Sequence, residues 1–110
     1  MLDKVNRHNV SLLSGLFRER ADLNRNYHFE LDSTCLLQNF YLEAGIIMPG
    51  LQVLDDPAGA KLHWGWEAPT CQLRGHFLGH WLSAAAAYCA SNEDIELKAK
   101  LDKIISELAR

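Results

Sequence analysis

Apolar residues recur at helical spacing along almost the whole chain, and this periodicity most limits the folds available to it. The first such stretch predicts an amphipathic helix from about Leu12 to Glu30, with charged residues between the apolar positions. Asp32 and Ser33 are good N-cap residues for a second, shorter helix, which should run to about Ala44 and stop at Gly45.

A third helix is predicted from about Cys71 to Ala90, and it is apolar nearly all round, as is typical of a buried helix. Ser91 and Asn92 are the candidate caps of a fourth helix. Its apolar stripe comprises Leu97, Leu101, Ile104, Ile105 and Leu108. No stretch alternates between apolar and polar residues as a half-buried strand does, so the predicted fold class is all-α.

The segment from Ile46 to Pro69 has no sustained period and carries the turn sequence 55–59, so we predict a long loop. Loops of this length are uncommon in compact domains and are usually functional or disordered. Trp64 and Trp66 favour the functional interpretation.

Charge and cysteine content exclude several classes of protein. The formal net charge is -3, without a run of like charge, which argues against nucleic acid or an anionic membrane as a partner. No stretch has the length of a membrane span or the form of a signal peptide, so we expect a soluble, cytoplasmic chain. Cys35, Cys71 and Cys89 lack the spacing of a disulfide framework or a zinc knuckle and are expected to be buried free thiols.

The chemically densest segment runs from Trp64 to Trp81. In a helix, His76 and His80 would share one face, and the neighbouring Gly75 and Gly79 would indicate that something approaches the backbone closely. The histidine pair has three possible roles: binding a metal together with Glu67 or Cys71, hydrogen bonding to a ligand, or buried polar packing.

The other groups of this segment also have alternative roles. Trp64 and Trp66 could form an apolar platform for a sugar, or they could anchor the loop to the core. Glu67 is the best candidate for a functional carboxylate, although an ion pair with Arg74 is equally consistent with the sequence. Cys71 at a helix start could favour a thiolate, but no spacing fixes a catalytic partner for it.

Several motifs together resemble one enzyme family. Gly65-Trp66-Glu67 followed by the stretch 73–84, LRGHFLGHWLSA, is similar to the N-terminal signature of the beta-L-arabinofuranosidase-like glycoside hydrolases of families 127 and 146. Residues 10–13, 31–32, 36–40, 44–45 and 97–110 look like successive parts of that family's first helices. The resemblance covers essentially the whole chain.

This resemblance implies the N-terminal helices of an (α/α)6 barrel, within a domain that hydrolyses terminal L-arabinofuranosyl groups with retention. It also implies a cysteine nucleophile held on zinc by further cysteines and a glutamate. The three cysteines of this chain do not match those ligands, so no catalytic residue, metal ligand or cofactor is assigned within it. The substrate-binding residues carried over are Trp66, Glu67, Gln72, Arg74, His76 and His80.

The helical pattern is still unterminated at Arg110, so we expect residues 1–110 to be the N-terminal fragment of one catalytic domain. Its expected partners are an arabinofuranoside and either the remainder of the barrel or further copies of itself. The alternative prediction is a non-catalytic helical module that binds a ligand or assembles through its apolar surface.

Overall fold

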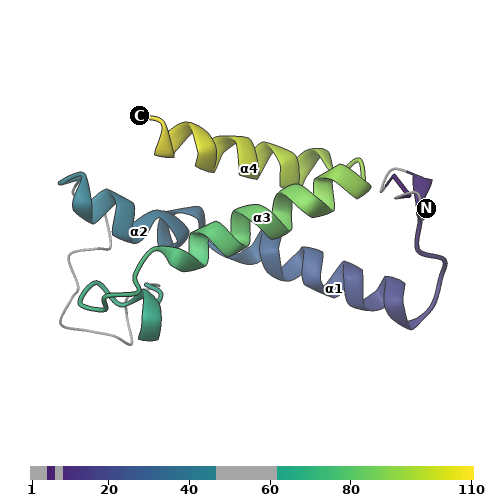
Figure 1. Ribbon diagram of the computed structural model, residues 1–110, viewed down its shortest axis with the longest axis horizontal. Helices are drawn as coiled ribbons and strands as arrows, with labels where there is room; N and C mark the ends of the chain where they lie inside the picture. The colour runs from purple at the N-terminus through teal and green to yellow at the C-terminus, as the bar shows by residue number, and fades with distance from the viewer. Residues whose placement is uncertain (1–4, 7–8, 47–61) are drawn as a thin grey trace.

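Four α-helices account for most of the residues that the structure describes (Figure 1). The structure is a computed structural model that describes residues 5–6, 9–46 and 62–110. The helices are α1 (Leu16–Glu30), α2 (Ser33–Glu43), α3 (His76–Ser91) and α4 (Ile95–Leu108), and a short 3-10 helix, η2 (Gly65–Glu67), precedes α3. Within those ranges there is no strand, which confirms the all-α prediction. The barrel arrangement stays a prediction.

Helix α2 begins and ends where the sequence predicts. The Asp32 carboxylate caps its start by accepting hydrogen bonds from the backbone N–H groups of Thr34, at 2.8 Å, and Cys35, at 3.2 Å. At its end Gly45 adopts a φ of 67°, and the Ile46 N–H donates to the Tyr41 carbonyl at 2.9 Å. This is the Schellman arrangement, in which a left-handed glycine allows the last carbonyls to find donors.

Helix α3 begins at His76. The sequence predicted a start at about Cys71, five residues earlier. The reason for the later start is Gly75, which has a φ of 92° and therefore cannot continue a right-handed helix. A Cβ at Gly75 would lie 3.5 Å from the Phe40 ring, whereas one at Gly79 would meet no described residue within 4 Å. A distance of 3.5 Å is ordinary van der Waals contact, so the expected close approach to the backbone is found at neither glycine, and the positive φ is what favours glycine at position 75.

Helix α4 also begins later in the sequence than predicted. Asp94 is the N-cap, since its carboxylate accepts from the Leu97 N–H at 2.9 Å. Ser91 and Asn92 instead bond back to α3, to the carbonyls of Ala87 and Tyr88, and so they finish the preceding helix. Helix α1 begins at Leu16 and not Leu12, because Gly15 interrupts the apolar pattern and supplies no capping side chain.

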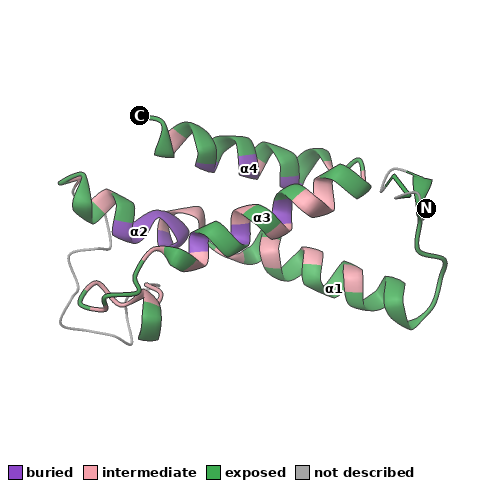
Figure 2. Ribbon diagram, viewed as in Figure 1, coloured by how far each residue is buried: buried purple, intermediate pink, exposed green. Residues whose placement is uncertain are grey.

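The core lies where α2, α3 and α4 meet, and α3 contacts each of the other helices (Figure 2). Its buried apolar residues are Leu36, Leu37, Leu78, Trp81, Ala85, Leu97, Leu101 and Ile104. One stripe of α3 is buried, so the prediction of a buried helix is confirmed for that stripe and was wrong for the rest of its surface. Its exposed positions carry mainly small residues, which cost little to expose.

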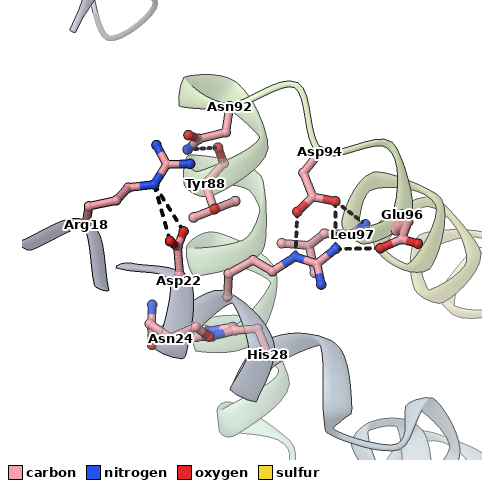
Figure 3. A network of polar contacts seen from close by, with 10 residues as sticks. Arg18, Asp22, Asn24, His28, Tyr88, Asn92, Asp94, Glu96 and Leu97 are labelled. Atoms are coloured by element: carbon pink, nitrogen blue, oxygen red, sulfur yellow. Dashed lines mark hydrogen bonds and ion pairs between the residues drawn. The ribbon is translucent and has the colours of Figure 1, made fainter. Parts of the chain in front are cut away.

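Helix α1 has no buried residue and is held to the bundle mainly by polar contacts. The Arg25 guanidinium reaches the Asp94 carboxylate with two hydrogen bonds, at 2.6 and 3.0 Å, and Glu96 with one at 2.9 Å. Figure 3 shows the two acceptors, Asp94 and Glu96, side by side before and at the start of α4. These hydrogen bonds lower the pKa of Asp94. One turn further along α1, near its C-terminal end, the indole of Trp81 donates to the His28 carbonyl at 3.1 Å.

Lys100 of α4 completes the attachment of α1. Its ammonium donates to the carbonyls of His28, Phe29 and Leu31 at the helix end, which α1 itself cannot satisfy. Burial lowers the pKa of this lysine. None of the helices described has the length and apolar content needed to cross a membrane.

Candidate functional site

The segment 62–75 carries Trp64, Trp66 and Glu67, and it reaches α3 through a series of tight turns. The Ala68 N–H donates to the Gly65 carbonyl at 3.1 Å, and the Cys71 N–H donates to the Ala68 carbonyl at 2.8 Å. This placement confirms a loop between the second and third helices for residues 62–69, with the 3-10 turn η2 inside it. The rest of the predicted loop, 47–61, lies outside the described residues.

Two buried amides of α2 hold this segment against the bundle. Gln38 accepts from the His63 N–H and donates to the His63 carbonyl, both at 2.8 Å, and it also donates to the Glu67 carbonyl at 3.0 Å. Asn39 donates from Nδ2 to the Glu67 carbonyl at 2.9 Å and to Glu67 Oε2 at 3.2 Å. The segment 63–67, called the tryptophan loop from here on, is thus held at both of its ends.

The Glu67 carboxylate lies at the N-terminus of α3, with the side chain 12% exposed. Oε2 accepts from the Gly75 N–H at 2.8 Å, and Oε1 accepts from the Phe77 N–H at 2.9 Å. A negative group there is favoured by the free N–H groups and by the helix dipole. Glu67 is therefore the cap of α3, supplied from eight and ten residues upstream.

His76 joins Glu67 to a row of exposed rings. Its Nδ1 lies 3.2 Å from Glu67 Oε1 and 2.8 Å from the Leu73 carbonyl oxygen. Because both neighbours are acceptors, we assign the hydrogen to Nδ1, which leaves Nε2 for other partners. The ring centroids of His76 and His80 are 5.6 Å apart, which confirms that the two share a face, and Trp66 lies 6.0 Å from His76.

The remaining predicted residues, Gln72 and Arg74, do not join this row. Arg74 forms an ion pair with Glu43 of α2, so the predicted alternative of an Arg74–Glu67 pair is wrong. Gln72 is exposed, and in the described part of the chain no hydrogen bond or ion pair connects it to the other candidates.

A cleft of about 390 Å³ opens beside Glu67, on the Trp64 side of the loop. Its lining includes aromatic side chains from three elements, and the His63 ring meets Phe77 edge-on at a centroid distance of 5.7 Å. Burial lowers the pKa of His63, a shift that the nearby Glu67 charge partly opposes. The cleft lining comprises Tyr27, Leu31, Leu62, His63, Trp64, Glu67 and Phe77.

The cysteines are dispersed over three elements. Cys35 is buried in α2, whereas Cys71 and Cys89 are half-buried, so the expected burial is confirmed for Cys35 and was wrong for the other two. Cys71 does not lie at a helix start, because α3 begins five residues later, so the predicted dipole activation of this thiol has no structural basis.

Comparison with known families decides what this arrangement belongs to. The model of the beta-L-arabinofuranosidase, GH127 catalytic domain, matches residues 9–110. The chain belongs to this family. The resemblance predicted from the motifs is thereby confirmed. No curated protein and no solved structure matches the chain.

The zinc site implied for a GH127 domain does not fit the residues described. Across 5–6, 9–46 and 62–110 there is no group of three His, Cys, Asp or Glu side chains placed to hold a metal ion. The carboxylate beside His76, that of Glu67, is engaged by backbone N–H groups.

Sequence reasoning missed Gln38 and Asn39 as parts of the candidate site, although the sequence held a signal for them. They interrupt the apolar run of α2, at positions that helical spacing places toward the core. Amides buried there require hydrogen-bond partners. The partner could not be predicted, because the loop that provides it lies 25 to 29 residues further along the chain.

Proposed function

We propose that this GH127 chain provides the substrate-side wall of a hydrolase that acts on terminal L-arabinofuranosyl groups. The observation that carries the proposal is the row of Trp66, His76 and His80, which lies on the loop and helix start that bear the family's motifs. The indole face can cover the C–H surface of a sugar, and the free imidazole nitrogens can hydrogen-bond to its hydroxyls.

Within this proposal Glu67 anchors the wall. A carboxylate offers about four acceptor positions. Donors lie at all of them, since Gly75 and Asn39 contact Oε2, and Phe77 and His76 contact Oε1. This occupancy favours a carboxylate that holds His76 in place over one that transfers a proton. Direct sugar contact by Glu67, Gln72 or Arg74 stays a prediction.

The proposed nucleophile and zinc ligands are residues other than those described, as the family resemblance implies. The proposal therefore assigns binding and orientation of the arabinofuranosyl group to this chain, and it assigns no bond-breaking step to it.

A fluorescence titration tests the proposal. Methyl beta-L-arabinofuranoside should change the tryptophan emission saturably, and methyl beta-D-galactopyranoside serves as the control sugar. Trp66 is 68% exposed and Trp81 only 1%, so the response should disappear in Trp66→Phe. His80→Ala should weaken binding while leaving the fold intact. An unchanged emission at all concentrations of the arabinofuranoside would exclude the proposed site.

A second candidate function is self-association through α1. Four large apolar side chains of this helix are exposed by 54% to 77%, an extent typical of surfaces that are covered by a partner. They are Leu16, Phe17, Leu23 and Tyr27. Sedimentation should then show a discrete oligomer that dissociates in Phe17→Glu, and a monomeric wild type would eliminate this candidate.

A further inference from the structure

We infer that Gln38 and Asn39 are positioning residues, which set the orientation of the tryptophan loop and, through Glu67, of His76. The inference rests on the proposed function, since it assigns the proposed sugar-binding row to a scaffold in α2. Neither amide lies in that row. Both are nearly inaccessible to solvent, with exposures of 1% and 4%.

Gln38 fixes the position of the loop backbone. Its amide pairs with both the N–H and the carbonyl of His63, as a neighbouring strand would, so translation or rotation of this peptide would break two bonds at once. The same Nε2 also donates to the Glu67 carbonyl. One rigid side chain therefore spans the loop from His63 to Glu67, the segment that contains both exposed tryptophans.

Asn39 fixes the direction of the Glu67 side chain relative to its own backbone. Its Nδ2 donates to the Glu67 carbonyl and to Oε2 of the same residue. A flipped amide would place Oδ1 against these two acceptors, so the donor orientation follows from electrostatics. Oδ1 is buried and has no hydrogen-bond partner in the described part of the chain. An apolar residue would avoid that unfavourable burial, which indicates that the Nδ2 donor is what this position requires.

The orientation then passes from Glu67 to the exposed row. Oε2 is shared between Asn39 and the Gly75 N–H, whereas Oε1 is shared between the Phe77 N–H and His76 Nδ1. Rotation of the carboxylate away from Asn39 would therefore change the first turn of α3. It would also remove one of the two acceptors beside Nδ1 of His76, leaving only the Leu73 carbonyl to orient this ring, which stands between Trp66 and His80.

Substitutions at Asn39 test the inference with two independent readouts. Asn39→Asp keeps the shape and replaces a donor by a charged acceptor, while Asn39→Ala removes the donor without adding charge. In both, the amide proton resonances of Gly75 and Phe77 should move upfield as their bonds to the carboxylate weaken. The dissociation constant for methyl beta-L-arabinofuranoside should rise by about tenfold in Asn39→Ala.

Leu37→Ala is the matched control, because Leu37 is as deeply buried in α2 and belongs to the apolar core instead of the loop contacts. It should lower the free energy of unfolding but leave the two amide resonances and the dissociation constant unchanged. If Asn39→Ala leaves the resonances in place, or moves them without changing sugar affinity, the positioning role is refuted.

The outcomes also separate this inference from the proposed function. A wild-type chain that does not bind the arabinofuranoside refutes the proposed function. The amide resonances of the Asn39 variants then decide by themselves whether the amide pair orients Glu67. If Asn39→Asp does not fold, Asn39→Ala and Gln38→Ala still provide both readouts.

Discussion

Replacing Glu67 by glutamine should destabilise the fold far more than its position in a surface loop indicates. The carboxylate caps α3 through the N–H groups of Gly75 and Phe77, at 2.8 and 2.9 Å. A glutamine can present its oxygen to only one of them and must point its NH2 group at the other donor. The variant therefore loses part of a helix cap and leaves a nearly buried N–H without an acceptor.

The magnitude follows from these two losses. Removal of a helix cap costs about 0.5–2 kcal/mol, and an unsatisfied buried N–H costs about 1–3 kcal/mol. We expect Glu67→Gln to lower the free energy of unfolding by about 1.5–5 kcal/mol, which is a large fraction of the stability of a small domain. Urea unfolding followed by far-UV circular dichroism measures this difference.

Glu43→Gln is the control for this prediction. Glu43 makes an ion pair with Arg74, but its side chain is 67% exposed, so the same change there should cost less than about 1 kcal/mol. Equal losses of stability in the two variants would refute the assignment of Glu67 as the cap of α3.

Two further predictions concern the attachment of α1. Asp94→Asn should lower the free energy of unfolding by about 1–3 kcal/mol, whereas Asp22→Asn, at the exposed pair with Arg18, should cost less than about 1 kcal/mol. Because the hydrogen bonds of Arg25 lower the pKa of Asp94 in the folded state, its contribution is present above the ordinary aspartate pKa of about 4 and is lost as the pH falls through the lowered value. Urea midpoints measured down to about pH 3 should therefore fall less steeply in Asp94→Asn, and equal slopes would contradict this. Lys100→Met removes donors to three carbonyls and should increase amide exchange at the end of α1, while Lys103→Met should not; identical exchange in both would contradict the capping role.

The helices were predictable because their signals are local. Asp32 and Gly45 bound α2 through side-chain and backbone chemistry that a short stretch of sequence contains. The start of α3 was not, because the pattern of apolar residues continues through Gly75 and only its left-handed conformation breaks the helix. Glycine adopts such conformations readily but does not require them.

The site was predictable only in part. The spacing of His76 and His80 placed them on one face, which the helix itself ensures. The role of Glu67 depends on partners in α2 and α3 that come together only in the folded chain. The same holds for Arg74, which forms its ion pair with Glu43 of α2 and not with Glu67. The way α1 attaches to the bundle could not be predicted for the same reason, because Arg25 pairs with Asp94 and Glu96 at the start of α4.

Chemical-shift mapping with methyl beta-L-arabinofuranoside tests the proposed sugar-binding wall most directly. The indole N–H of Trp66 and the imidazole signals of His76 and His80 should shift together and saturate at one dissociation constant. The buried indole of Trp81 should stay unchanged. Unchanged spectra, or shifts confined to the opposite end of α3 around Tyr88, would contradict the proposal that this chain binds an arabinofuranosyl group at the start of α3.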